Sequence, residues 1–214
     1  MKIGKRFDKL ADVYETEIRK KIPQYDELQK VFFSLVSLRR KEELDILDLG
    51  LGTGEVAGKL LQRYPNAKLV GIDASSRMIQ RARLKLEDFS SRVKLIQSEF
   101  KKLPSLGKFD FIYSILAIHH LSAKDKQALF NNIWHMLRPD GRFLLMDVFQ
   151  GSTSGLTNLY VRLTFPFDPE DKPSSLMEQL QWLSEAGFKR IDVAWKYFKL
   201  AAIIAFKVTE TDLV

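Results

Sequence analysis

The 214-residue sequence contains no cysteine, only three histidines and no long uninterrupted apolar run. Without cysteine the chain can form neither disulfides nor thiolate sites, which suits a cytoplasmic enzyme. Three histidines, two of them adjacent, are too few for an ordinary zinc site, so no metal site is expected. No stretch approaches the length of a membrane span, and the first residues lack the order of a signal peptide, so no membrane partner is expected.

Acidic residues are fewer than basic ones: the sequence has 34 Lys and Arg and 27 Asp and Glu, which gives a net charge of +7. A positive field attracts RNA or acidic metabolites. The clearest basic stripe is formed by Arg77, Arg81 and Lys85, at i,i+4 spacing on one expected helix. We interpret it as a solvated helix face, since charge runs on helices usually have that role.

One stretch organises the rest of the chain. The apolar run 44–49 predicts a buried strand, three glycines follow at alternate positions (Gly50, Gly52, Gly54), and an apolar pattern with helical spacing resumes after them. A strand that passes through glycines into a helix makes a nucleotide seat, because the backbone can approach the ligand closely. Glu55 stands where a dinucleotide motif has Gly or Ala. A carboxylate there opposes a pyrophosphate but tolerates an ammonium and a sulfonium, which favours S-adenosylmethionine over NAD.

The residues Asp48-Leu49-Gly50-Leu51-Gly52-Thr53-Gly54 resemble the acidic-x-G-x-G-x-G motif of class I S-adenosylmethionine-dependent methyltransferases. Three later segments match in order: 69–75 resembles that family's second strand, 109–114 its fourth, and 137–145 the turn into its fifth. The resemblance covers roughly residues 44 to 148. It implies an α/β, Rossmann-like methyltransferase fold: a mostly parallel seven-stranded sheet with an antiparallel C-terminal hairpin and helices on both faces.

We expect a single methyltransferase domain over residues 1–214. Its parts are an N-terminal helical lid (1–43), a cofactor-binding core (44–148), a substrate cover (149–175) and a C-terminal helix and hairpin (176–214). The alternating pattern predicts strands near 44–49, 68–73, 92–97, 109–114 and 141–148, and helices near 54–64, 75–88 and 122–137. The cover is irregular but rich in apolar side chains, which favours a small, partly apolar substrate.

The lid carries two helical patterns, one before and one after Pro23. The order Phe7-Asp8-x-x-Ala11-x-x-Tyr14-Glu15 is similar to the F-D-x-x-A-x-x-Y-D lid of many such methyltransferases. This resemblance makes Tyr14 a candidate for a contact with the cofactor. A core tyrosine is the alternative.

The resemblance also implies which residues hold the cofactor. Asp73, at the end of the second strand, would accept both ribose hydroxyls, unless it caps the next helix. Asp48 would organise the glycine loop, and Met78 would pack on the adenine, unless it is a core residue. Glu99, where the family more often has Asp, would accept from the adenine amino group, with a solvated loop glutamate as the alternative. The other implied contacts are Gly50, Gly52, Gly54, Ala74, Phe100, Ser114 and Ile115.

Methyl transfer to a weakly acidic nucleophile requires positioning and removal of a proton. His119 and His120 follow the fourth strand, and histidine titrates near neutrality. We place His119 toward the substrate and His120 toward the cofactor edge, with packing as the alternative for both. Asp147, at the end of the fifth strand, is the other candidate base or else a capping residue. It would need a partner or a raised pKa if buried. His135 is expected to be structural.

These observations predict a methyltransferase that uses S-adenosylmethionine, releases S-adenosylhomocysteine and methylates an O, N or C atom of a small-molecule acceptor. A faint similarity, in 7–14 and in Ile22-Pro23-x-Tyr25, to carboxy-S-adenosylmethionine synthases leaves an RNA- or tRNA-modification enzyme open. Nucleic acid is therefore a less favoured partner. A non-catalytic cofactor-binding protein is the third interpretation, and a homodimer is compatible with the sequence.

Overall fold

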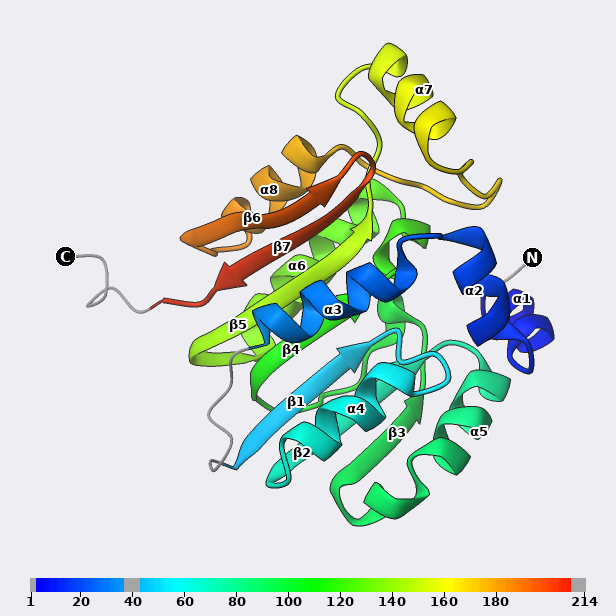
Figure 1. Ribbon diagram of the computed structural model, residues 1–214. Coiled ribbons are helices and arrows are strands. Elements are labelled where there is room, and N and C mark those ends of the chain that lie inside the picture. Colours follow the sequence, from blue (N-terminus) through cyan, green and yellow to red (C-terminus); the bar gives the residue numbers. More distant parts are fainter. Residues whose placement is uncertain (1–2, 37–42, 209–214) are drawn as a thin grey trace. The chain divides into compact units, whose positions relative to one another are not determined.

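The computed structural model describes residues 3–36 and 43–208. Residues 1–2 and 37–42 of the predicted lid and residues 209–214 of the predicted C-terminal part therefore lie outside the described chain. The chain folds as two compact units, one ending at Phe109 and the other beginning at Asp110. Its seven strands have the order β3-β2-β1-β4-β5-β7-β6 (Figure 1). This order confirms the expected mostly parallel α/β sheet with an antiparallel C-terminal hairpin.

The first unit alternates helices with parallel strands. Its elements are α1 (Ile3–Leu10), α2 (Tyr14–Lys21), α3 (Tyr25–Leu35), β1 (Leu44–Leu49), α4 (Glu55–Arg63), β2 (Ala67–Asp73), α5 (Ser76–Lys85), η1 (Glu87–Arg92), β3 (Val93–Gln97) and η2 (Phe100–Lys102). All but one residue of β1 is buried, which explains why this strand reads as an apolar run. In the parallel register Leu49 lies beside Ile72, so the glycine loop and Asp73 leave neighbouring strand ends.

The second unit closes with an antiparallel hairpin. Its elements are β4 (Phe109–Ile115, starting at the boundary), η3 (Ile118–His120), α6 (Ala123–Met136), β5 (Leu137–Val148), α7 (Ser154–Leu163), α8 (Leu176–Glu185), β6 (Arg190–Tyr197) and β7 (Leu200–Phe206). Strand β7 pairs antiparallel with both β5 and β6. Helix α8 starts at a capping box, in which the Ser175 hydroxyl accepts from the N–H of Glu178 and the Glu178 carboxylate accepts from the N–H of Ser175.

Two segments differ from the predicted elements. The lid has three helices instead of two, because the chain breaks at residues 11–13 without a glycine or proline to signal it. The segment 149–175 contains helix α7, which the Thr153 hydroxyl caps by accepting from the N–H of Leu156. None of the α7 residues is buried, and the helix projects from the second unit (Figure 1). Among the described residues, no helix combines the length and apolarity needed to cross a bilayer.

Candidate functional site

The glycine loop after β1 is tied to β2 and has a backbone that favours glycine. The N–H groups of Gly50 and Leu51 both donate to the carbonyl of Ile72, at 2.9 Å each. The φ angles of Gly50, Gly52 and Gly54 are +93°, +56° and +80°. Residues with side chains rarely adopt this left-handed region, so the turn depends on its three glycines.

Asp73, the last residue of β2, points its carboxylate at this loop. Its Oδ2 accepts from the N–H of Gly52 at 2.9 Å, and its Oδ1 accepts from the N–H of Ser75 at 2.8 Å. The helix cap is Ser75, whose hydroxyl accepts from the N–H of Met78, so Asp73 is not the cap of α5. Burial raises the pKa of Asp73 more than these hydrogen bonds lower it. Each carboxylate oxygen has a second lone pair, which a ribose diol can use.

The other predicted cofactor residues of the first unit differ in exposure. Asp48 and Met78 are 3% and 1% exposed, so the Met78 side chain belongs to the core of this unit. Ala74 follows Asp73 directly, and Glu99 and Phe100 are half-buried where η2 begins after β3. Their contacts with the cofactor stay predictions.

Tyr14, the predicted lid residue, lies over the glycine loop. A Cβ atom built on Gly52 would lie 3.9 Å from Cε1 of the Tyr14 ring. The ring also meets Phe7 edge-on, with 6.1 Å between ring centroids. This position is the one that a lid contact requires, and the contact with cofactor itself stays a prediction.

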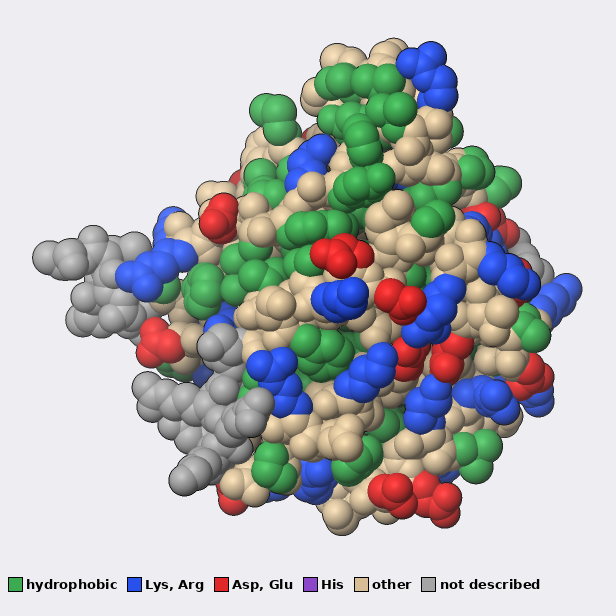
Figure 2. Space-filling model, viewed as in Figure 1, with side chains coloured by type: hydrophobic (Ala, Val, Ile, Leu, Met, Phe, Trp, Pro, Cys, Tyr) green, Lys and Arg blue, Asp and Glu red, His purple; other side chains and the backbone are tan. Residues whose placement is uncertain are grey.

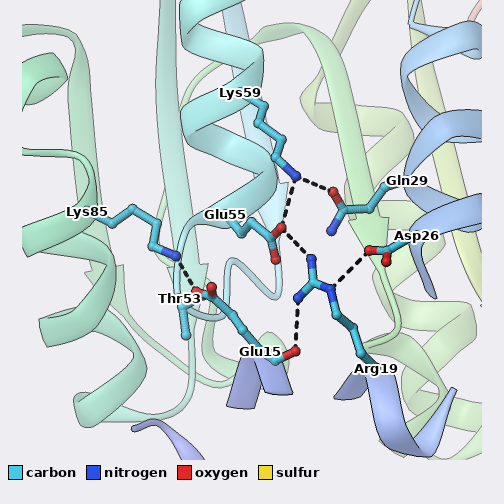
Figure 3. Close-up of polar contacts among 8 residues, drawn as sticks. All are labelled: Glu15, Arg19, Asp26, Gln29, Thr53, Glu55, Lys59 and Lys85. Carbon is cyan, nitrogen blue, oxygen red and sulfur yellow. Dashed lines mark hydrogen bonds and ion pairs between the residues drawn. The ribbon is translucent and has the colours of Figure 1, made fainter. Parts of the chain in front are cut away.

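Glu55, the first residue of α4, is held by two cations (Figure 3). Its Oε1 lies 2.8 Å from Nη2 of Arg19 and 2.9 Å from Nζ of Lys59. Burial would raise the pKa of Glu55, but hydrogen bonds from Arg19 and Lys59 outweigh burial and hold the pKa below its ordinary value of 4.5. Since the protein's own cations pair with this carboxylate, its charge opposes a pyrophosphate less than the sequence alone suggests.

Glu15 of α2 connects the lid to the glycine loop and to α5. Its Oε1 accepts from the Thr53 hydroxyl at 2.7 Å and pairs with Nζ of Lys85. Nη1 of Arg19 donates to the Glu15 carbonyl at 2.9 Å (Figure 3). Polar contacts on two sides therefore hold α2 against the loop.

The basic stripe on α5 also faces the lid. A nitrogen of Arg77 lies 2.8 Å from the Asp12 carboxylate, Arg81 approaches the same group at 3.8 Å, and Lys85 pairs with Glu15. Asp8 completes the contact by accepting from the backbone N–H of Arg77 at 3.1 Å. The stripe is exposed, as the interpretation of a solvated face expects, and its side chains in addition pair with the acidic groups of the lid.

The lid network predicts a loss of stability in acid. Burial would raise the pKa of Glu15, but hydrogen bonds from Lys85 and Thr53 lower it by more. The pKa values of Glu15 and Glu55 therefore both lie below the ordinary 4.5. Groups with a lowered native pKa stabilise the fold above the unfolded-state pKa and lose that effect as the pH falls through the native pKa. The free energy of unfolding, measured by urea titration, should therefore fall between about pH 5 and pH 3.

Two glutamine variants test this assignment. In Glu55→Gln, the free energy of unfolding should fall less steeply than in the wild type as the pH is lowered through this range. Glu17→Gln, in an exposed pair with Lys20 on the same helix α2, should keep the wild-type slope. A Glu55→Gln protein with an unchanged slope would show that the network does not contribute.

In the second unit, His119 and Asp147 form a buried pair. Nδ1 of His119 lies 2.5 Å from Oδ1 of Asp147, and the side chains are 9% and 1% exposed. The N–H groups of His119 and Val148 donate to the same carboxylate at 2.9 and 2.8 Å. Burial lowers the pKa of His119, but the charge of Asp147 and its hydrogen bond outweigh burial and raise the pKa above 6.5. The structure thus joins two side chains that the sequence offered as separate candidate bases.

Asp171, from the predicted substrate cover, faces both histidines. Its Oδ1 lies 3.5 Å from Nε2 of His119 and 3.2 Å from Nδ1 of His120. The His119 carbonyl accepts from the N–H of Lys172 at 2.8 Å, which fixes this end of the cover. Burial is the main cause that lowers the pKa of His120 below its ordinary value. His120 therefore lies with His119 and Asp171 in one cluster.

Two buried lysines anchor the cover further. Nζ of Lys126 donates to the Ser174 hydroxyl at 2.9 Å, and Nζ of Lys199 lies 3.6 Å and 4.0 Å from the ring centroids of Phe165 and Phe167. Both lysine side chains are fully buried.

The cover is also closed at its base. Gln150 and Ser175 form an isolated β-bridge between the two ends of the segment. The cover is therefore a closed loop with fixed ends.

The remaining candidates of the second unit lie on β4 and α6. Ser114 is fully buried and Ile115 is half-buried at the end of β4. The next residue, Leu116, has a φ of +53°, a strained value for leucine that occurs where the chain turns toward η3. His135 is exposed on α6 beside Trp134, and its expected structural role stays a prediction.

Sequence reasoning missed Asp171, Lys126 and Lys199. Asp171 stands in the acidic run 168–171, which looks like a solvated loop, and 51 residues separate it from His120. The two lysines resemble any exposed lysine in sequence. No local signal could have assigned them, because their surroundings come from the tertiary fold.

Comparison with known proteins gives consistent results. A family model described as a methyltransferase domain matches residues 46–141. A carboxy-S-adenosyl-L-methionine synthase from Nautilia profundicola is 26% identical over 96% of this chain and 96% of its own length.

Solved structures are similar as well. An O-methyltransferase family protein from Burkholderia thailandensis superposes with a TM-score of 0.70 at 15% identity, over 95% of this chain and 60% of that one. Human N-acetylserotonin methyltransferase in complex with S-adenosylmethionine gives a TM-score of 0.58 at 24% identity, over 77% of this chain and 48% of that one.

Proposed function

We propose that this protein, an S-adenosylmethionine-dependent enzyme with a class I methyltransferase fold, methylates an O, N or C atom of a small molecule. The seat of the cofactor is the glycine loop with Asp73, and Tyr14 covers it. S-adenosylhomocysteine is the product. A cytoplasmic location is part of the proposal and rests on the cysteine-free sequence.

The observation that carries the proposal is the buried His119–Asp147 pair. Methyl transfer proceeds by in-line attack on the sulfonium methyl, so the protein must orient the nucleophile and take up its proton. Asp147 fixes the orientation of the imidazole and makes it a stronger proton acceptor than free histidine. A pair that is only 9% and 1% exposed suits a small acceptor.

The charge distribution supports a small acceptor over RNA. The clearest basic stripe, on α5, pairs with Asp12 and Glu15 of the lid. In the view of Figure 2, acidic side chains lie among the Lys and Arg side chains around α4 and α5. Phosphate binding uses basic groups that are available to the ligand, and this stripe is already paired.

A second candidate function is synthesis of carboxy-S-adenosylmethionine. One observation favours it: the similarity to the Nautilia profundicola synthase spans 96% of both chains and thus includes the lid. The two functions share the cofactor and differ in the second substrate.

Calorimetric titration of the purified protein with S-adenosylmethionine, S-adenosylhomocysteine and NAD tests the cofactor seat. We expect micromolar binding of the first two, which corresponds to a binding free energy of about −8 kcal/mol. We expect no binding of NAD. Binding of NAD alone would contradict the proposal.

Mass spectrometry then separates the two functions. The protein is incubated with S-adenosylmethionine and a panel of hydroxyl-, amine- and carboxylate-bearing metabolites. Formation of S-adenosylhomocysteine with a methylated acceptor supports methyl transfer. Accumulation of a carboxylated cofactor without S-adenosylhomocysteine supports the second candidate. Light scattering of the same preparation decides between a monomer and a homodimer.

A further inference from the structure

His119, His120 and Asp171 bring three metal-binding atoms together inside the second unit. The two imidazole nitrogens and the carboxylate oxygen all lie within 4.8 Å of one another. The three side chains are 9%, 10% and 8% exposed. Such a group differs from a surface acidic cluster, because two of its members are imidazoles and all three are removed from solvent.

The distances fit a first-row transition metal. Zinc binds imidazole nitrogen and carboxylate oxygen at about 2.0–2.2 Å, which puts two tetrahedral ligand atoms about 3.4 Å apart. Oδ1 of Asp171 lies 3.2 Å from Nδ1 of His120 and 3.5 Å from Nε2 of His119. Each imidazole nitrogen is therefore spaced from the carboxylate oxygen as it would be around one ion, and the two nitrogens lie within 4.8 Å of each other.

Asp171 has an oxygen available for this purpose. Its Oδ2 accepts from the N–H of Asp168 at 2.8 Å. Its Oδ1 is buried and faces the two imidazoles, at 3.2 Å from Nδ1 of His120 and 3.5 Å from Nε2 of His119. A buried carboxylate oxygen that faces two imidazole nitrogens is costly unless a cation or a proton lies between them.

Asp147 supplies the supporting contact that metal-binding histidines usually have. With a proton on Nδ1, His119 donates to Asp147 at 2.5 Å and directs the lone pair of Nε2 at Asp171. A carboxylate on the far side of a ligating histidine fixes its tautomer and strengthens it as a ligand.

We propose that Nε2 of His119, Nδ1 of His120 and Oδ1 of Asp171 bind a divalent transition-metal ion such as Zn²⁺. Two imidazoles and one carboxylate are a common ligand set for zinc and related ions, and three protein ligands leave a position for one more group. The proposal differs from the expectation drawn from the sequence, where three histidines are too few for an ordinary zinc site. That expectation did not consider Asp171 as a ligand.

The ion would also define the acceptor, and this step rests on the proposed function. An acceptor with a hydroxyl or carboxylate oxygen can occupy the remaining position, where a metal makes a bound hydroxyl more acidic. While such an ion is bound, Nε2 of His119 would be a ligand and could not itself take up a proton. The ion would then supply the activation of the acceptor that the His119–Asp147 pair supplies without it. The favoured substrate class is then a small hydroxy or hydroxy-acid molecule.

The site is tested with the tag-free full-length protein after chelator treatment and dialysis. Co²⁺ is titrated while the visible d–d absorption is followed, and Zn²⁺ is titrated against a chromophoric chelator. We expect saturable binding of a single ion per chain. Asp171→Asn and His120→Gln should each weaken it by about 10–100-fold or more, since even supporting residues contribute that much.

His135→Gln is the matched control, because it removes the histidine outside the cluster and should bind the ion as the wild type does. Circular dichroism establishes that each variant is folded. Absence of saturable binding by the wild type, or equal binding by folded Asp171→Asn and His120→Gln, overturns the inference. Titration of the same preparations with S-adenosylmethionine separates this outcome from failure of the proposed function, since cofactor binding does not depend on the ion.

Discussion

Replacement of His119 by glutamine is expected to slow methyl transfer by about 10²–10⁴-fold, the usual contribution of a positioned proton acceptor. Glutamine keeps a polar side chain of similar length but cannot take up a proton at neutral pH. The affinity for S-adenosylmethionine should stay unchanged, because the variant leaves the glycine loop, Asp73 and the other predicted cofactor residues intact. The rate is measured as S-adenosylhomocysteine formation with the acceptor found in the screen, and the affinity by calorimetry.

Asp147→Asn is the companion variant. It removes the charge that orients His119 and raises its pKa, so its rate should fall as well. Because the two side chains act together, the double variant should lose little more than His119→Gln alone. His135→Gln should retain the wild-type rate. A wild-type rate in His119→Gln would exclude the pair from the reaction, and independent, additive losses would argue against a joint action.

Replacement of Asp73 by alanine is expected to weaken S-adenosylmethionine binding at least tenfold. Hydrogen bonds to a charged group contribute roughly 1.5–3 kcal/mol, and the variant removes the carboxylate that the ribose hydroxyls would use. The structure adds a second effect, because the Asp73 carboxylate also accepts from the N–H groups of Gly52 and Ser75. The seat is therefore less ordered in the variant.

Asp88→Ala is a suitable control for Asp73→Ala. Asp88 is an exposed carboxylate of the same unit, in η1, and its loss should leave the calorimetric affinity unchanged. An unchanged affinity in Asp73→Ala would remove this residue from the cofactor site. A loss of equal size in both variants would point to a general charge effect.

The core strands and the glycine loop were predictable because local sequence determines them. Strand β1 was expected at 44–49 and is found there, since its apolar run ends in glycines whose positive φ angles enforce the turn. The match of this region to the methyltransferase domain confirms the resemblance that the motif indicated. The match to a methyltransferase domain and the similarity to a carboxy-S-adenosyl-L-methionine synthase agree with the expected cofactor. The argument from Glu55 contributes less to that expectation, because this carboxylate is paired with Arg19 and Lys59.

The polar contacts were not predictable from the sequence. Asp12 and Arg77 pair although 65 positions separate them, and only the packing of the lid helices on α5 brings them together. The same holds for Asp171 and the two histidines. Helix α7 had a local signal, the Thr153 cap, but the glycines at 151 and 155 made the segment look irregular.

The closed base of the cover has a consequence for how acceptor preference can change. The two ends of the cover meet at the Gln150–Ser175 bridge, and the cover residues that Lys126 and Lys199 contact all follow α7. Doubling the length of a flexible loop costs only about 0.6 kcal/mol when its ends are already fixed. Residues 152–164, none of them buried, can thus be exchanged, lengthened or shortened while the core stays as it is. The second unit can therefore hold different versions of this exposed segment between the same fixed ends. Proteins with the same cofactor site can in this way differ in the acceptor they use.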